Sequence, residues 1–445
     1  MKRRRIFVAI ISIMVLAALV ALSWPALAQR GSLPTEARII PRKTTFSYGF
    51  DFAQQGPYSF TGANNRYAVT RARYVMRSIP GMLEDTAIMD WGLGSPEPVS
   101  GKFNLADIRG RVGLTVSTGG IPVITLCTAP NWMKHGAGPD IAPSVKNYQN
   151  FAILAARIAQ EFPQVRYFVV WNELKGFWNA SKGLWNISKY TILYNMVYRA
   201  IKKVRPSAEV GGPYIIVTPY SSPQAGNRNS TPHGKWGYLA QYVLDAIDYW
   251  LTHKAGASFI AVDGADFPKS GQVTNPLVAT QMYARVDRWL RTQTRLPIWW
   301  MESHIQPPAS GWSARRAAAL RVAVLVRLAA SGATAGLQWQ PQQGEGIPDA
   351  GLWTATGTRD GGQPTYLADV LPRVLAVLSR PVTITSASPS GALVARSIKG
   401  TIMLNAGTSF VSVVVHMKRI ILEPGEVSVI LRSLPGQGSG KIVGS

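Results

Sequence analysis

The 445-residue sequence contains a single cysteine, Cys127, so no disulfide can form within the chain. It has no G-x-S-x-G elbow and no G-x-x-x-x-G-K-[ST] loop, so acyl transfer and phosphoryl transfer have no support in the sequence. The five histidines are scattered and, with one cysteine, form no metal-ligand spacing. We therefore expect neither a metal nor another cofactor, and a fold that relies on its hydrophobic core.

Acidic residues are scarce as well. There are 23 Asp and Glu against 47 Lys and Arg, and the formal net charge is +24. The basic residues are spread along the chain and form no basic helix, zinc finger or RNP-type motif, which argues against nucleic acid as a partner. The charge could direct the protein to an anionic polysaccharide, or it could simply reflect a surface with few acids.

Long hydrophobic runs are missing except at the N-terminus. Residues 1–5 are MKRRR, an apolar run follows, and Ala26-Leu27-Ala28 fits the small-residue pattern of a signal-peptide cleavage site. We predict a signal peptide over 1–28 and a linker over 29–44. Residues 1–28 carry four basic residues and no acid, so a secreted or extracytoplasmic mature chain has a formal charge of +20. The alternative is an uncleaved membrane anchor, because about 17 apolar residues just suffice to span a bilayer.

Strand-like runs alternate with helical stretches from residue 44 onwards. The runs are 44–52, 86–92, 122–130, 165–173, 208–214, 258–266, 296–303 and 334–340. Apolar residues recur at helical spacing in 148–162, 189–204, 237–254, 278–293 and 313–332. Alternating strands and helices predict parallel βα units, and eight such units close into a (β/α)8 TIM barrel, which is an α/β fold. We predict this barrel over residues 45–381.

The pattern changes after residue 381. Short β-runs separated by turn residues, with no long helix among them, predict a small all-β, sandwich-like domain over residues 382–434. The Gly- and Ser-rich residues 435–445 are typical of a disordered tail.

Two glutamates follow predicted strands. Asn172-Glu173 ends the fourth, and Glu302-Ser303 ends the seventh. The C-terminal strand ends of a TIM barrel meet at one face, so the two carboxyls should lie across the barrel mouth from each other. Facing carboxyls are what the hydrolysis of a glycosidic bond requires, one as proton donor and one as nucleophile. Either Glu alone could instead form a salt bridge at the rim.

These segments resemble the retaining (β/α)8 glycoside hydrolases of clan A, and most of all family 39, the β-xylosidase and α-L-iduronidase family. The similar stretches are VWNE (170–173) with Phe177-Trp178, AEVGGP (208–213), WMES (300–303) and residues 120–132. The resemblance implies that Glu173 is the acid/base and Glu302 the nucleophile. It also implies that Asn172 hydrogen-bonds the sugar 2-hydroxyl.

Three positions depart from the family pattern. Leu174 stands where a proline usually follows the acid/base, and Asp263 stands where strand six usually carries a histidine. At strand two, Met89-Asp90-Trp91 replaces the usual Arg or His. These positions surround the sugar pocket, so the sugar and its linkage stay open.

Aromatic and polar side chains at the strand ends are candidates for binding sugar. Aromatic rings pack on the C–H face of a sugar, and we expect this of Trp91, Trp132, Trp178 and Trp339. Asp263 and His304 are further candidates. Asp263 could instead cap the following helix, and His304 could instead have a structural role. Trp171 and Trp178 should also give Glu173 an apolar setting that suits a proton donor.

We therefore predict a retaining glycoside hydrolase that acts on a poly- or oligosaccharide. A closed pocket would favour a xylosidase-like exo-enzyme, and a long groove would favour endo-hydrolysis. The retaining mechanism requires the two carboxyls to lie about 5–5.5 Å apart. The alternative is a non-catalytic glycan-binding or cell-surface protein on a barrel scaffold, which the departures at strands two and six would fit.

Overall fold

The computed structural model describes residues 45–51, 66–89, 94–222, 232–269, 275–305, 311–343, 350–388 and 390–432. The predicted signal peptide, linker and disordered tail lie outside these ranges, as does the candidate Trp91. Among the described residues, no helix is both long and apolar enough to cross a membrane.

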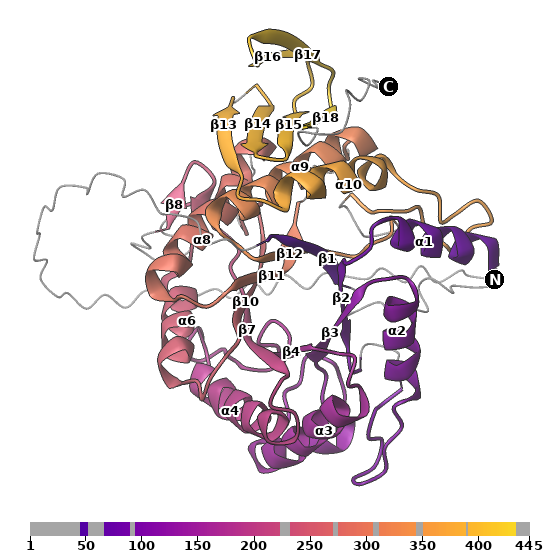
Figure 1. Ribbon diagram of the computed structural model, residues 1–445. Coiled ribbons are helices and arrows are strands. Elements are labelled where there is room, and N and C mark those ends of the chain that lie inside the picture. Colours follow the sequence, from indigo (N-terminus) through magenta and orange to yellow (C-terminus); the bar gives the residue numbers. More distant parts are fainter. Residues whose placement is uncertain are drawn as a thin grey trace, which may run out of the picture. The chain divides into compact units, whose positions relative to one another are not determined.

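Parallel strands close into a barrel (Figure 1). They are β1 (Ser47–Asp51), β2 (Leu83–Ala87), β3 (Ile121–Leu126), β4 (Tyr167–Val170), β7 (Glu209–Ile216), β10 (Phe259–Ala265), β11 (Ile298–His304) and β12 (Ala335–Trp339). They follow one another in chain order, and β1 closes the barrel by pairing with β12 and β2. The predicted TIM barrel is confirmed, and every predicted run overlaps one of these strands.

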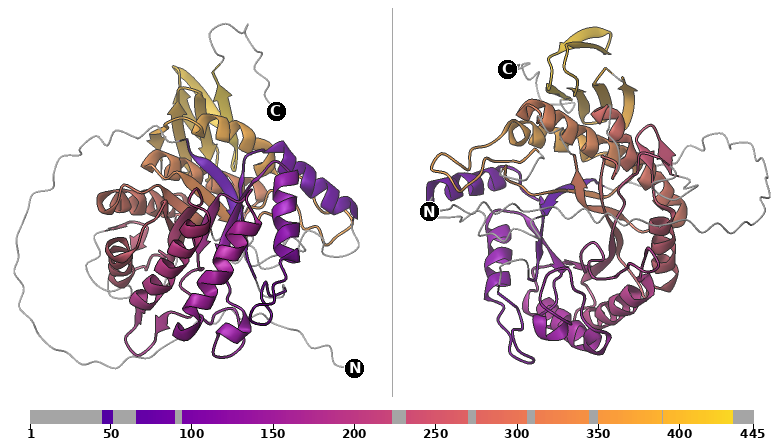
Figure 2. Two further views of the ribbon diagram at one scale, coloured as in Figure 1. Left: turned by 60° about the horizontal axis from the view of Figure 1, so that its bottom comes forward. Right: turned by 180° about the vertical axis from the view of Figure 1, so that it is seen from behind.

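Helices cover the outside of the barrel (Figure 2). They are α1 (Arg66–Ser78), α2 (Ala106–Ser117), α3 (Tyr148–Glu161), α4 (Ile187–Val204), α6 (Gln241–His253), α7 (Pro276–Ala279), α8 (Gln281–Gln293), α9 (Ala314–Ser331) and α10 (Tyr366–Leu378). The predicted helical stretches correspond to α3, α4, α6, α7 with α8, and α9. Helix α9 is buried on almost every face because α8, α10, the barrel and the C-terminal sheet all pack against it.

The second strand differs from its predicted position. The sequence pattern indicates 86–92, whereas β2 spans Leu83–Ala87 and holds Glu84 and Asp85 in the interior. Two adjacent acidic residues are rarely fully buried, so the hydrophobic pattern places the strand after them. The shift moves the strand end away from Asp90 and places Asp85 among the inward-facing groups.

Apolar side chains fill the N-terminal end of the barrel. Tyr167, Phe259 and Trp299 contact one another there, and the ring centroids of Phe259 and Trp299 are 4.3 Å apart. Further inward-facing apolar residues complete this cluster, namely Leu83, Val123, Val169, Met301, Ala335 and Leu337. The cluster closes one end of the barrel, so polar inward-facing residues gather at the C-terminal ends of the strands.

A small all-β region follows α10 and confirms the second part of the predicted fold. Its main sheet has the order β13 (Thr383–Ala387), β14 (Ala392–Ser397), β15 (Gly400–Asn405) and β18 (Val427–Leu431). One face packs on α9 and α10, as Figure 1 shows, while the hairpin β16 (Val411–Val415) with β17 (Lys418–Leu422) covers the other. Strand alternation sends Leu393 and Ala395 to the helices and Val394 to the hairpin.

Glu84 makes the stability of the fold depend on pH. Burial of its carboxyl raises the pKa of Glu84 to about 8, and the neighbouring Thr115 of α2 only partly opposes this rise. The folded chain therefore keeps a proton that the unfolded chain loses near pH 4.5, so stability falls as the pH rises from 4.5 through 8. We expect Glu84→Gln to remove this part of the decline and to be more stable than wild type at pH 9 by a few kcal/mol.

Urea unfolding of the wild type and Glu84→Gln at pH 5 and pH 9 measures the effect. The difference in unfolding free energy between the two proteins should shift in favour of the variant at the higher pH. An equal difference at both pH values would contradict the proton linkage of Glu84.

Candidate active site

Five carboxyl groups meet at the C-terminal mouth of the barrel. Asp51, Asp85, Asp263 and Glu302 come from β1, β2, β10 and β11, and each is at most 2% exposed. Glu173 follows β4 directly. Parallel strands point their C-terminal ends to one face of a barrel, so residues far apart in the sequence meet there.

Glu302 lies at the centre of this group because of an irregularity in β11. The register between β10 and β11 shifts between Val262 and Asp263, which pair with Trp300 and Glu302. Met301, between these partners, belongs to the apolar interior, and Glu302 turns into the barrel mouth as well. Bulges of this kind often re-aim side chains next to functional sites.

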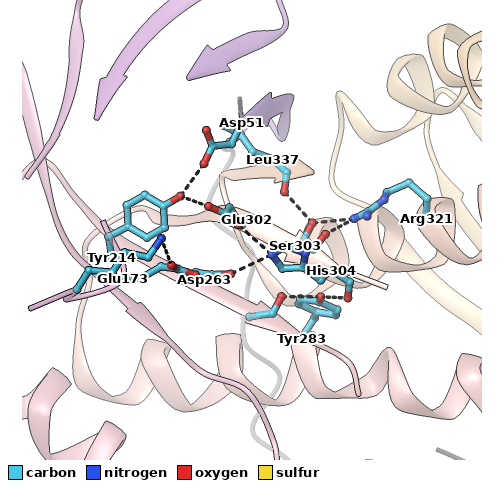
Figure 3. A network of polar contacts seen from close by, with 12 residues as sticks. Asp51, Glu173, Tyr214, Asp263, Tyr283, Glu302, Ser303, His304, Arg321 and Leu337 are labelled. Carbon is cyan, nitrogen blue, oxygen red and sulfur yellow. Dashed lines mark hydrogen bonds and ion pairs between the residues drawn. The ribbon is translucent and has the colours of Figure 1, made fainter. Parts of the chain in front are cut away.

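Two side chains hold the Glu302 carboxylate in place (Figure 3). Tyr214 Oη lies 2.8 Å from Oε1, and His304 Nε2 lies 2.9 Å from Oε2. Burial alone would raise the pKa of Glu302, but the hydrogen bond and charge of His304, with further contributions from Asp51 and Lys175, lower it. Glu302 is therefore a buried carboxylate that stays ionised, as a nucleophile must.

Tyr214 also contacts Asp51, so it bridges two carboxyls. Its Oη lies 2.7 Å from Asp51 Oδ2 and can donate its one proton to either acid. The residue bulges out between Pro213 and Ile215, which pair with consecutive residues of β10, and its φ of 55° is left-handed. This strained backbone is what aims the ring into the interior, and strain of this kind is common at functional sites.

Burial shifts two of the acids towards their neutral form. Burial, with the charges of Asp85 and Glu302, raises the pKa of Asp51 well above its ordinary value. Burial likewise raises the pKa of Asp85 to about 7, although Thr125 donates a hydrogen bond to Asp85 Oδ2 at 2.6 Å. Packing this many acids together is tolerable because several of them carry protons.

Glu173 stands on a strained turn at the end of β4. Trp171, Glu173 and Leu174 all have left-handed φ values of 70°, 49° and 52°. The turn brings Lys175 Nζ within 2.7 Å of Glu173 Oε2. Burial alone would lower the pKa of Lys175, but the Glu173 carboxylate raises it.

The apolar setting expected for Glu173 is not what the structure contains. The Trp171 ring packs edge-on against Phe151 and Phe177, and its Nε1 donates to the Lys175 carbonyl. The turn at the strand end rotates this ring into the shell between barrel and helices, and the nearest charged neighbour of Glu173 is an ammonium group. No pattern in the sequence singles out Lys175 for this position.

Asp263 lies between the two glutamates. It neighbours Glu173 and lies 3.7 Å from His304 Nε2, on the side of the imidazole that faces Glu302. Burial, followed by the charges of Glu302 and Glu173, raises the pKa of Asp263 well above its ordinary value. Glu302, Asp263 and Glu173 thus lie next to one another across the mouth.

Asp263, Glu302 and His304 also place ligand-type atoms within 4.8 Å of one another. The Nε2 that would bind an ion donates to Glu302 instead, and the raised pKa of Asp263 favours its neutral form. We therefore treat His304 as a hydrogen-bond partner of Glu302 with Asp263 beside it, and assign no metal ligands among them.

A second layer supports β11 from outside. Ser303 donates to the Leu337 carbonyl at 2.7 Å, and Arg321 of α9 donates to both oxygen atoms of Ser303. Tyr283 of α8 donates to the His304 carbonyl at 2.7 Å. These contacts lock the backbone on both sides of Glu302 and so set its direction.

Some buried polar atoms around the mouth lack a hydrogen-bond partner among the described residues. They are Thr128 Oγ1, Asn172 Oδ1, Asp263 Oδ1, Trp339 Nε1 and Gln340 Oε1. Leaving a buried polar atom unsatisfied costs about 1–3 kcal/mol, so such atoms suggest a ligand that completes them. Donors and acceptors are mixed here, which suits the hydroxyl groups of a sugar.

The aromatic candidates divide into two groups. Trp339 ends β12 beside His304, with ring centroids 5.4 Å apart, and so borders the acid cluster. Trp132 lies in the short helix η2 (Asn131–Met133), half-buried, and donates to the Glu97 carbonyl. Trp178, 43% exposed, packs on Trp185 in the hairpin β5 (Trp178–Asn179) with β6 (Leu184–Trp185). No contact of Trp132 or Trp178 joins it to the acid cluster within the described residues.

Three further residues of the cluster were missed by reasoning from the sequence, namely Asp51, Asp85 and Tyr214. Asp51 ends a predicted strand, so its position alone could have marked it. Asp85 was hidden by the displaced boundary of β2. Tyr214 follows Gly-Gly-Pro at a strand end, but only the pairing of β7 with β10 reveals its inward direction.

No family model and no curated protein matches the sequence. Among solved structures, a family 39 glycoside hydrolase from the gut symbiont Bacteroides cellulosilyticus WH2 is similar, with a TM-score of 0.55 and 15% identity over 83% of this chain and 72% of that one. A monomeric β-xylosidase from Caulobacter crescentus CB15 has a TM-score of 0.54 and 16% identity over 82% and 74%. SrfJ from Salmonella typhimurium has a TM-score of 0.58 and 12% identity over 88% and 91%. The chain thus has the (β/α)8 fold that its resemblance to family 39 of the clan A glycoside hydrolases implies.

Proposed function

We propose that the protein is an exported glycoside hydrolase that cleaves an O-glycosidic bond of a poly- or oligosaccharide with retention of configuration. Glu302 attacks the anomeric carbon and forms a glycosyl ester, while Glu173 delivers a proton to the leaving oxygen and then activates water. The reaction needs no cofactor. The substrate class is that of β-xylosides and related β-glycosides, because the similar protein from Caulobacter crescentus is a β-xylosidase.

The setting of Glu302 carries the proposal. It is 2% exposed, its pKa is lowered, and Tyr214 and His304 fix both oxygens. A buried carboxylate kept ionised by directional hydrogen bonds is ready to attack and to stabilise positive charge on a sugar ring. Asp263 lies between it and Glu173, the second carboxyl that the reaction requires.

The surroundings support a sugar as the ligand. Asn172 Oδ1 and Trp339 Nε1 are buried without hydrogen-bond partners among the described residues; Asn172 follows β4 next to Glu173, and Trp339 ends β12, between β1 and β11. Asn172 is the residue that would bind the sugar 2-hydroxyl, and Trp339 offers both a ring face and a donor. We therefore propose both as sugar contacts.

A second candidate function is binding of a glycan without cleavage. The ion pair between Lys175 and Glu173 favours it, because the 2.7 Å contact occupies an oxygen of the side chain that should reach the leaving group. This candidate predicts affinity for polysaccharides and no covalent intermediate.

Trapping of the covalent intermediate tests the proposal. The protein is incubated with 2,4-dinitrophenyl 2-deoxy-2-fluoro-β-xyloside and the corresponding glucoside, digested and analysed by mass spectrometry. We expect one fluorosugar on the peptide that contains Glu302, and none on the same peptide of a Glu302→Gln variant. The fluorine slows both steps, but a good leaving group lets the ester form and accumulate.

Each other outcome has a definite meaning. Labelling of a different carboxyl would overturn the assignment of the nucleophile. Retention of the protein on a polysaccharide gel, with no labelling by either sugar, would favour the binding protein over the hydrolase.

A further inference from the structure

An ion pair holds the side chain of Glu173 at the barrel mouth. Lys175 Nζ lies 2.7 Å from Glu173 Oε2, and the two side chains are only 18% and 15% exposed. By contrast, the ion pair of Arg166 with Glu209 lies on the surface, where the side chains are 62% and 30% exposed. Exposed pairs contribute little because water and salt screen them, whereas a pair shielded from solvent can hold its partners in one geometry.

The turn after β4 brings the two side chains together. Glu173 and Leu174 both have left-handed φ values, 49° and 52°, which residues with a side chain rarely adopt. These values fold the chain back, so that Lys175 returns to the carboxyl of Glu173. Leu174 could not be proline in this conformation, because the proline ring fixes φ at about −65°. The departure from the family pattern at Leu174 and the ion pair therefore belong to one local structure.

The backbone of Lys175 is fixed from both sides. Its N–H donates to the Asn172 carbonyl at 3.0 Å, and its own carbonyl accepts from Trp171 Nε1 at 2.7 Å. The Trp171 ring is fully buried and packs edge-on against Phe151 and Phe177. The lysine side chain thus starts from a rigid base, which is what a group that orients another side chain requires.

The proposed reaction depends on where the Glu173 carboxyl points, because a general acid must lie within hydrogen-bond distance of the leaving oxygen. We propose that Lys175 is a positioning residue: by holding Oε2 of Glu173, its ammonium directs Oε1 to the leaving oxygen. The proposal rests on the proposed glycosidase function and deepens it. Lys175 acts through Glu173, need not touch the substrate and exchanges no proton with it.

The same orientation serves the second step of the reaction. There the carboxyl of Glu173 takes a proton from the water that attacks the anomeric carbon. The attacking water replaces the leaving group on the same side of the sugar, so one fixed position of Oε1 suits both steps. Lys175 keeps its charge throughout.

The charge of Lys175 also reaches Glu302, whose pKa is lowered mainly by His304 and to a smaller extent by Lys175. An effect that ran through Glu302 would slow the attack on every substrate alike. An effect that runs through Glu173 changes only those reactions that need an acid. Substrates with good and poor leaving groups therefore separate the two routes.

Lys175→Met removes the ammonium and keeps the length of the side chain. We expect kcat/KM for alkyl or sugar leaving groups to fall about 100-fold, because misplacing a reacting group by about 1 Å has an effect of that size. For 2,4-dinitrophenyl glycosides kcat/KM should stay within about threefold, since a good leaving group needs no acid. For the same substrates kcat and KM should fall together, because hydrolysis of the ester still needs an oriented base.

The double variant Glu173→Gln/Lys175→Met tests whether Lys175 acts through Glu173. Once the acid is gone, loss of the ammonium should have no further effect, so the double variant should match Glu173→Gln within about threefold. Lys202→Met is the matched control. The ammonium of Lys202, in α4, donates to the Ala208 carbonyl at 2.9 Å, at the N-terminal end of the barrel. Its loss should leave the ratio of kcat/KM for good and poor leaving groups unchanged.

Crystal structures of the wild type and Lys175→Met give a readout that needs no substrate. The Glu173 carboxyl should have one orientation in the wild type, and a different one or several in the variant. A single, unchanged orientation of Glu173 in the variant would overturn the positioning role.

The kinetic outcomes distinguish the proposal from its foundation. Failure of the wild type to be labelled by any fluorosugar would overturn the glycosidase function, and the positioning role with it. Labelling at Glu302, together with equal losses or no loss of kcat/KM for good and poor leaving groups in Lys175→Met, would overturn only the role of Lys175. So would a further large loss in the double variant, because Lys175 would then act by another route.

Discussion

Replacement of Glu302 by Gln is expected to lower kcat/KM on the order of 10⁵-fold for every substrate, whatever its leaving group. The amide cannot attack the anomeric carbon or stabilise its positive charge. Fold and binding should persist, because Gln keeps the shape of the side chain and can still accept from Tyr214. Steady-state kinetics with aryl glycosides measure the effect.

Glu423→Gln serves as the control for this variant. Glu423 is an exposed carboxylate in the C-terminal β-region, paired with Arg315 at 3.2 Å, and no contact joins it to the acid cluster within the described residues. Its loss should leave kcat/KM unchanged.

A Glu302→Gly variant with azide should make a glycosyl azide of inverted configuration, because azide enters from the side of the missing carboxylate. An azide product of retained configuration would mean that Glu302 is the acid/base and not the nucleophile.

Replacement of Glu173 by Gln is expected to discriminate between substrates. For poor leaving groups we expect kcat/KM to fall by about 10³-fold, the contribution of a general acid. For 2,4-dinitrophenyl glycosides the first step should remain fast while hydrolysis of the ester slows, because no base activates water. Both kcat and KM should then fall together as the intermediate accumulates, which a burst of dinitrophenolate would reveal.

Azide also tests the role of Glu173 as a general base. It needs no base, so it should restore turnover of dinitrophenyl glycosides by Glu173→Gln and give a product of retained configuration. Glu209→Gln, an exposed ion-pair partner of Arg166 at the opposite end of β7, is the control and should behave as wild type. Equal losses for all leaving groups, with no response to azide, would show that Glu173 is a structural residue.

The strands and most helices could be predicted from local pattern. Strands of a parallel barrel are covered on both faces and therefore read as short continuous apolar runs, which alternate here with amphipathic stretches. The prediction failed where charge interrupts such a run, as Glu84 and Asp85 do in β2. Thr125 of the neighbouring strand donates a hydrogen bond to Asp85, and no window of sequence around the two acids contains that information.

The candidate site was predictable to the extent that it follows strand ends. Glu173 and Glu302 were assigned because each closes a strand, and the same rule led to Asp263, His304 and Trp339. The rule does not say which of these touch. Trp132 and Trp178 also follow strands, yet their contacts lie with Glu97 and with Trp185.

The sequence by itself therefore determined the order of elements, the class of fold and the two glutamates at the barrel mouth. These features depend on the period of apolar residues and on position along each strand. The direction of each side chain and the protonation of the acids were decided by the tertiary structure. A bulge in β11 turns Glu302 inward, another in β7 inserts Tyr214, and a strained turn after β4 brings Lys175 to Glu173. Proton distribution among buried acids depends on charges a few ångströms away in space, and these come from five different strands.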